Sequence, residues 1–103
     1  MKIVEEKDFN EEIKNGVCLV DFYASWCGPC RIMANILEDI AEELGEKVNV
    51  FKVDVDNTEK VSRNFGIMSI PTLIIFKDGE MKEKHVGIWQ QEDCVQAVKK
   101  YLD

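Results

Sequence analysis

Apolar residues run almost unbroken through several short segments, a pattern typical of strands buried on both faces of a sheet. The clearest segments are VCLVDFY (17–23) and LIIF (73–76). KVNVFKVDV (47–55) is a further β-rich run, and two strands are predicted in 72–87. Asp78-Gly79 interrupts the last of these, and this dipeptide favours a hairpin turn between two strands. A short first strand is predicted for KIV (2–4).

Elsewhere apolar residues recur at about 100° per residue, which predicts amphipathic helices. The longest predicted helix extends from Gly28 to Leu44, and Gly45 ends it. Its apolar side is predicted to hold Ile32, Met33, Ile36, Leu37, Ile40, Ala41 and Leu44. The last helix is predicted over 91–102, where acidic residues near the start and lysines near the end suit the helix dipole.

Two shorter helices are predicted from their capping residues. In 8–16, Asp8 is the expected N-cap and Glu11 its capping-box partner. In 58–66, Thr58 or Asn57 is the expected N-cap. Both segments end at a glycine, the residue that favours a helix C-terminus.

The expected order is therefore β-α-β-α-β-α-β-β-α. Early strands that alternate with helices favour parallel pairing, and the late hairpin requires antiparallel pairing. We therefore predict an α/β protein with a central mixed β-sheet and helices on both faces. With 103 residues and no repeat or linker, 1–103 is expected to form a single domain.

Charge and hydropathy exclude some partners. The formal net charge of −7 disfavours nucleic acid and anionic membranes, which require clustered Lys and Arg. No apolar run approaches the ~20 residues of a membrane span, and the N-terminus lacks the apolar core of a signal peptide. We expect a cytoplasmic protein, and a monomer, because no long apolar stripe remains once the core is assigned.

The four cysteines are Cys18, Cys27, Cys30 and Cys94. In a reducing cytosol a close pair favours metal binding or redox chemistry. A closed zinc site needs four ligands, and His85 is the lone histidine, so such a site is disfavoured, although a metal bridging two chains stays an alternative. We expect Cys18 and Cys94 to be small buried hydrophobes, the alternative being a regulatory thiol.

The pair Cys27 and Cys30 suits redox chemistry because it lies at the first turn of the long predicted helix. The helix N-terminus stabilises a thiolate, which makes Cys27 a nucleophile near neutral pH. Pro29 fits the first turn, where no backbone hydrogen bond is lost. Cys30 can then attack a mixed disulfide within the same chain. This chemistry requires no bound cofactor and no metal.

Two charged residues fall where apolar ones are expected. Asp21 lies within CLVDFYA, and a buried carboxyl with a raised pKa would suit a proton acceptor near neutral pH. The alternative is an Asp that ends a strand or faces solvent. Lys52 lies at the centre of VFKVDV and is either the partner charge of Asp21 or exposed at the end of its strand.

The motif VDFYASWCGPC resembles the active-site signature of the thioredoxin family, and Trp26, Cys27, Gly28, Pro29 and Cys30 match it in full. IPT (70–72) is similar to the family's cis-proline loop, and FKDGE (76–80) with VG (86–87) to its final hairpin. Tyr23 occupies a position often held by Trp, and Met68-Ser69 one where Arg-Gly is frequent.

The resemblance implies a thioredoxin fold and a general disulfide reductase. In that reading Cys27 attacks, Cys30 resolves, and Asp21 is the buried carboxyl with Lys52 beside it. The peptide bond before Pro71 is expected to be cis. The substrate-binding surface is expected to comprise Trp26, Ile70, Pro71, Val86, Gly87 and Ile88, with ordinary core packing as the alternative for the aliphatic members.

The resemblance also implies partners: disulfide-containing proteins as substrates and a thioredoxin reductase as the source of electrons. Two rival functions remain at this point. An oxidant or isomerase of similar sequence usually carries a His between its cysteines, whereas this chain has Gly28-Pro29. A non-catalytic binding subunit would use the same surface without redox chemistry.

Overall fold

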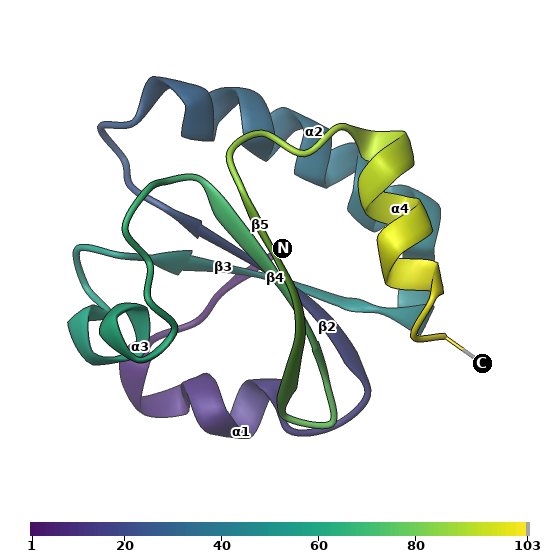
Figure 1. Cartoon of the computed structure of the whole chain (residues 1–103), viewed down its shortest axis with the longest axis horizontal. Helices are drawn as coiled ribbons and strands as arrows, with labels where there is room; N and C mark the ends of the chain where they lie inside the picture. Colours follow the sequence, from purple (N-terminus) through teal and green to yellow (C-terminus); the bar gives the residue numbers. More distant parts are fainter. Residues whose placement is uncertain (103) are drawn as a thin grey trace.

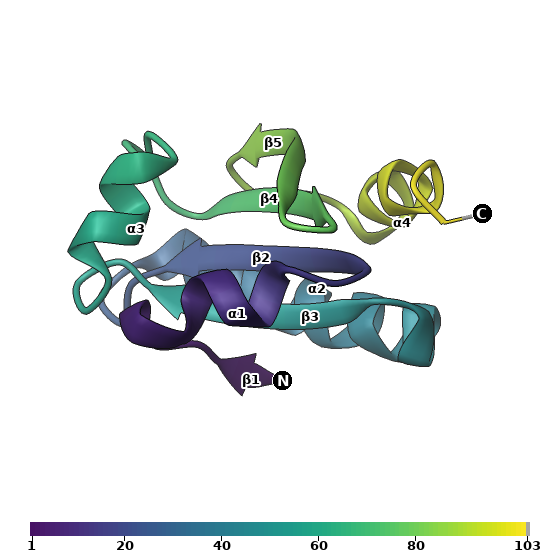
Figure 2. The ribbon, with the colours of Figure 1, turned by 90° about the horizontal axis from the view of Figure 1, so that it is seen from below.

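The computed structural model describes residues 1–102 and contains one five-stranded mixed sheet in the order β1-β3-β2-β4-β5 (Figures 1 and 2). Strands β1, β3 and β2 are mutually parallel, while β4 is antiparallel to β2 and β5 to β4. The predicted mixed sheet is confirmed. The strands are β1 (Lys2–Ile3), β2 (Val17–Tyr23), β3 (Asn49–Asp54), β4 (Thr72–Lys77) and β5 (Glu80–Val86).

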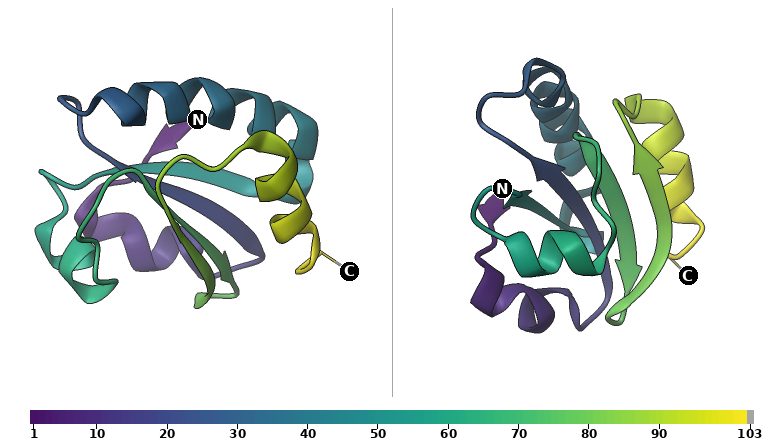
Figure 3. Two further views of the ribbon diagram at one scale, coloured as in Figure 1. Left: turned by 45° about the horizontal axis from the view of Figure 1, so that its top comes forward. Right: turned by 60° about the vertical axis from the view of Figure 1, so that its left-hand side comes forward.

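Helices cover both faces of this sheet, as predicted (Figures 1 and 3). One face carries α2 and α4, which pack together with the sheet in a single apolar cluster. The other carries α1 and α3, with a second apolar cluster beneath them. The helices are α1 (Phe9–Ile13), α2 (Gly28–Leu44), α3 (Glu59–Asn64) and α4 (Gln91–Lys99).

Strand β2 lies at the centre of the sheet and is buried on both faces. Because side chains alternate along a strand, Leu19 joins the cluster under α2 and α4, while Val20 and Phe22 join the cluster under α1 and α3. Asp21 alternates with the latter two, so its side chain lies on the face covered by α2. The β2 terminus thus positions both a carboxyl and the loop that leads to Cys27.

Several predicted boundaries differ from the structure. Asp8 does not cap α1 through its side chain, because residues Glu6–Asp8 form a 3-10 turn that leads into the helix, so the capping-box prediction is wrong. The last helix ends at Lys99 instead of 102, and its final residues make shorter-range backbone bonds. On α2, Ile32 is 55% exposed although it was predicted on the apolar side.

Thr58 is the N-cap residue of α3, as predicted, but its side chain makes no cap bond to the helix and instead donates its hydroxyl to the Asp54 carbonyl. The helix is capped from a distance. The Glu6 carboxylate accepts the backbone N–H groups of Lys60 at 2.5 Å and Val61 at 3.1 Å. A carboxylate at this end satisfies unpaired donors and complements the helix dipole.

Among residues 1–102, no helix has the length and apolar character needed to cross a membrane.

Replacing Glu6 by Ala removes the acceptor for two N–H groups of α3 and is expected to lower the free energy of unfolding by about 1 kcal/mol. Urea denaturation measures this change. The matched control is Glu5→Ala, whose exposed side chain forms no such bond. Equal losses in the two variants would contradict the capping role of Glu6.

Candidate active site

Cys27 and Cys30 lie at the start of α2, with their sulfur atoms bonded as a disulfide and their Cα atoms 5.2 Å apart. Cys27 is the N-cap of the helix, and Pro29 occupies the first turn. Cys27 is 6% exposed and Cys30 4%, so accessibility alone does not assign different roles to them. Their positions relative to the helix do, because Cys27 lies just outside it and Cys30 within it.

The Cys27 sulfur accepts the backbone N–H of Cys30 at 3.2 Å. The bond has the geometry of an ordinary N-cap, with sulfur in place of a hydroxyl or carboxylate oxygen. Once the disulfide is reduced, the same N–H and the positive end of the 17-residue helix face a thiolate. Such an arrangement favours the thiolate form of a cysteine at the N-terminus of a helix.

A second loop faces the cysteines. The Ile70-Pro71 peptide bond is cis, as the resemblance implied, and the Ile70 carbonyl oxygen lies 3.9 Å from the Cys27 sulfur. Ile70 is half-buried and packs against the cluster of Ala24, Cys27 and Cys30. The N–H of Gly87 donates to the Pro71 carbonyl at 2.7 Å, which joins the end of β5 to this loop.

The surroundings of the disulfide are apolar and open. Trp26 is 68% exposed, Met68 95%, and Val86 is exposed at the end of β5. The alternative of core packing is therefore wrong for Val86. It holds for Ile88, which packs against the cluster under α2 and α4. A Cβ at Gly87, where φ is +97°, would meet nothing within 4 Å.

Two tertiary contacts were not identified from the sequence. The indole N–H of Trp26 donates to the Asp56 carboxylate at 2.9 Å, which fixes the exposed ring beside Cys27. At the end of α3, the Lys84 ammonium donates to the carbonyls of Phe65 and Gly66 at 2.8 and 3.0 Å. These contacts join segments that are distant in sequence, so no local sequence pattern predicts them.

Asp21 is fully buried, and neither of its carboxyl oxygens has a hydrogen-bond partner. Burial raises its pKa from 3.8 to about 7, and the charge of Lys52 opposes this rise. The predicted burial is confirmed, and the solvent-facing alternative is wrong.

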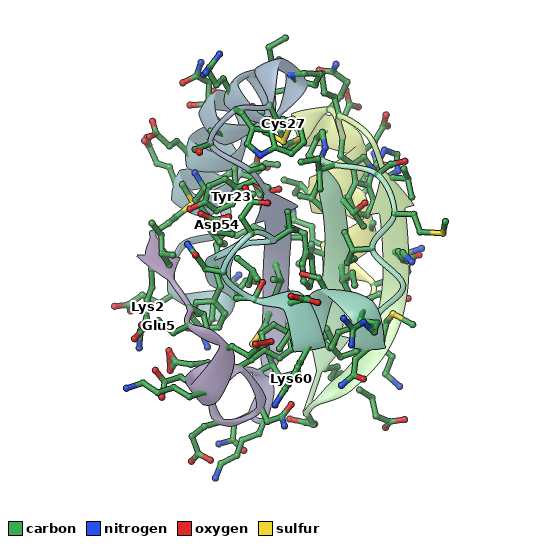
Figure 4. The ribbon with its side chains drawn as sticks, turned by 90° about the vertical axis from the view of Figure 1, so that its left-hand side faces the viewer. Lys2, Glu5, Tyr23, Cys27, Asp54 and Lys60 are labelled. Atoms are coloured by element: carbon green, nitrogen blue, oxygen red, sulfur yellow. A yellow bond between two sulfur atoms is a disulfide. The ribbon has the colours of Figure 1, made fainter. Side chains whose placement is uncertain are left out.

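Lys52 is the direct neighbour of Asp21 in the parallel pairing of β2 and β3, as the sequence suggested. However, no ion pair joins the two side chains in the described part of the chain. The Lys52 ammonium instead lies over the Tyr23 ring, 4.4 Å from its centroid. Figure 4 shows Tyr23 beside Asp54, with Cys27 at the end of the molecule beyond them.

The remaining candidates lie apart from the disulfide. Cys18 and Cys94 are fully buried and unpaired, which confirms them as small core residues, and burial raises the pKa of both thiols, that of Cys94 to about 12. His85 stacks on Trp89 with ring centroids 4.5 Å apart. Within residues 1–102, no group of three or more His, Cys, Asp or Glu side chains is arranged to hold a metal ion.

Replacing Asp21 by Asn is expected to stabilise the oxidised protein increasingly as pH rises. The unfolded carboxyl ionises near 3.8 and the folded one near 7, so the native Asp loses stability as pH rises through this window. The gain of Asp21→Asn over the parent protein should grow by up to roughly 4 kcal/mol between about pH 4 and pH 8.

Urea denaturation at the two pH values measures this difference. Asp39→Asn, on the exposed side of α2, is the control and should show little change with pH. A gain for Asp21→Asn that is the same at both pH values would show that the folded carboxyl titrates normally.

Comparison with known proteins agrees with this geometry. The family profile described as Thioredoxin matches residues 1–100. A thioredoxin from Staphylococcus saprophyticus is 44% identical over 96% of this chain and 95% of its own, and one from Bacillus subtilis is 43% identical over 99% and 100%. A thioredoxin variant from Halobacterium salinarum superposes with a TM-score of 0.89 at 32% identity, covering 99% of this chain and 90% of its own.

These relatives span nearly the whole chain, and the paired cysteines lie at disulfide distance at the start of a helix. Together these observations support thiol–disulfide oxidoreductase activity. The chain therefore belongs to the thioredoxin family.

Proposed function

We propose that the protein is a general protein disulfide reductase that acts as a recycled electron carrier. The observation that carries this proposal is the Cys27 sulfur, which caps α2, accepts the Cys30 N–H, and lies among exposed apolar side chains. A stabilised thiolate on an apolar surface is suited to attack disulfides presented by other proteins.

In the first step the Cys27 thiolate attacks one sulfur of a substrate disulfide. A mixed disulfide forms between Cys27 and that sulfur, and the other substrate sulfur leaves as a thiolate that takes up a proton. In the second step the Cys30 thiol loses its proton and attacks the Cys27 sulfur. The Cys27–Cys30 disulfide forms and the second substrate thiolate leaves, so two electrons pass from the chain to the substrate.

Asp21 is the proposed acceptor of the Cys30 proton. It is buried on the face of the sheet that α2 covers, and its pKa of about 7 leaves it able to take and release a proton near neutral pH. A carboxyl with an ordinary pKa would be a much weaker base at that pH. The charge of Lys52 helps to keep part of the Asp21 population ionised.

The proposed substrate surface surrounds Cys27 and comprises Trp26, Gly28, Pro29, Ile70, Pro71, Val86 and Gly87. Trp26 and Val86 offer exposed apolar area, and Gly87 leaves the approach open. The Ile70 backbone is available to pair with an extended substrate segment beside the sulfur.

We further propose that a thioredoxin reductase restores the dithiol, and that the protein works as a monomer in the cytoplasm. The two unpaired buried cysteines suit a reducing compartment. The chain needs no bound cofactor, because its electrons reside in the Cys27–Cys30 couple.

Replacing Cys27 by Ser is expected to abolish reduction of insulin disulfides in the presence of dithiothreitol, because no nucleophile remains. Replacing Cys30 by Ser should instead accumulate a mixed disulfide through Cys27, seen by mass spectrometry under non-reducing conditions. Cys94→Ala, which removes a thiol buried far from the site, is the control and should retain activity. Full activity of Cys27→Ser would contradict the proposed attack.

Replacing Asp21 by Asn is expected to slow insulin reduction by at least about tenfold near neutral pH, because a proton acceptor is lost. The parent rate should change with pH around the Asp21 pKa of about 7, and this inflection should vanish in the variant. Steady-state rates over about pH 6 to 9 measure both effects. An unchanged rate throughout this range would exclude Asp21 as the acceptor.

A further inference from the structure

The buried carboxyl of Asp21 and the ammonium of Lys52 are neighbours that do not pair. They occupy matched positions on adjacent parallel strands, so their side chains leave the same face of the sheet. Pairing would relieve the cost of burying the carboxyl. Even so, both Asp21 oxygens are without a hydrogen-bond partner. Another group is therefore needed to hold the Lys52 ammonium away from the Asp21 carboxyl.

Tyr23 supplies that alternative. It lies two residues after Asp21 on β2, on the same face of the strand, and its half-buried ring has the Lys52 ammonium 4.4 Å from its centroid. An aromatic face attracts a cation at this distance, and more strongly where water is partly excluded. One cation thus has two competing partners, an aromatic face and a carboxylate.

We propose that Tyr23 is a positioning residue whose ring holds the Lys52 ammonium away from Asp21 and so sets the pH at which Asp21 exchanges its proton. This inference deepens the proposed function and rests on the role given there to Asp21. Tyr23 also packs against the cluster of Ala24, Cys27 and Cys30, but it takes no part in bond making or proton transfer in this scheme. It acts through Lys52, and Lys52 acts through its charge.

Each charged or titratable group around Asp21 fits this arrangement. From β3, Lys52 lies directly beside Asp21, and Asp54 lies two register positions further along, opposite Tyr23. From β4, the paired residue is the apolar Leu73. Burial raises the pKa of the Tyr23 hydroxyl, and the charges of Asp54 and Asp21 raise it further, so Tyr23 stays neutral and its ring remains a partner for the cation. On α2, Cys27 and Cys30 carry no charge while they form a disulfide.

The position of the ammonium matters for the reaction. A carboxylate in close contact with a cation is a weaker base, since the cation favours the ionised form. A carboxyl buried with the cation held at a distance keeps a higher affinity for the proton. The Tyr23 ring thereby keeps Asp21 suited to accept a proton near neutral pH, while Lys52 remains near enough to moderate the effect of burial.

Direct titration of the Asp21 carboxyl tests this inference without reference to catalysis. The oxidised protein, labelled with ¹³C at aspartate carboxyls, is followed by NMR across the pH range, with the Asp21 signal assigned from Asp21→Asn. Tyr23→Leu removes the aromatic face, and Tyr23→Phe is the matched control that keeps it. Each substitution is also made in a Lys52→Met background, where no ammonium is present.

Tyr23→Leu is expected to lower the Asp21 titration midpoint by roughly one pH unit, because Lys52 is released toward the carboxyl. Tyr23→Phe should leave the midpoint near that of the parent. In the Lys52→Met background, Tyr23→Leu should no longer lower it. An unchanged midpoint in Tyr23→Leu overturns the inference. So does an equal lowering in the Lys52→Met background, since it would show that the ring only excludes water.

The rate profile of insulin reduction separates this inference from the proposed function. If the Asp21 midpoint moves in Tyr23→Leu and the inflection in rate moves with it, both stand. If the midpoint moves and the rate profile does not, Tyr23 still positions Lys52, and the proton-acceptor role of Asp21 is the part that fails.

Discussion

Burial of β2 on both of its faces is the constraint around which this molecule is arranged. The strand pairs with β3 on one side and β4 on the other, and its side chains enter both apolar clusters. Removing so much apolar surface from water provides the main driving force for folding. The same burial fixes the end of β2, from which a short loop leads to Cys27. The stability of the sheet and the placement of the redox pair therefore depend on one strand.

That constraint also gives Asp21 its chemistry. A carboxyl placed in such a strand is separated from water, and its proton becomes harder to remove. The buried carboxyl lowers the stability of the fold at neutral pH, and the same raised pKa supports the proton-acceptor role proposed for Asp21. The cysteine pair faces the opposite requirement, a thiol that loses its proton easily. The N-terminus of α2 provides that environment only a few residues further along the chain.

Much of this could be predicted from the sequence because the signals are local. The bounds of β2 and α2 follow from an unbroken apolar run and from helical periodicity between two glycines. The Cys27–Cys30 pair lies at a recognisable helix start. The contacts that the sequence did not reveal join distant segments. Glu6 caps α3 from another part of the chain, and Asp56 fixes Trp26. Lys52 was correctly predicted beside Asp21. Its ammonium lies over the Tyr23 ring and not against the carboxylate, and this depends on side-chain packing that the sequence pattern does not encode.

The central claim is that the Cys27–Cys30 couple donates electrons, and its reduction potential tests this most directly. The protein is equilibrated in dithiothreitol buffers of known ratio, trapped with an alkylating agent, and its oxidised fraction is read by mass. A disulfide reductase is expected to have a potential more negative than about −260 mV, so that the dithiol reduces protein disulfides in a reducing cytosol. A potential at or above about −220 mV would contradict the central claim and would favour an oxidant or isomerase.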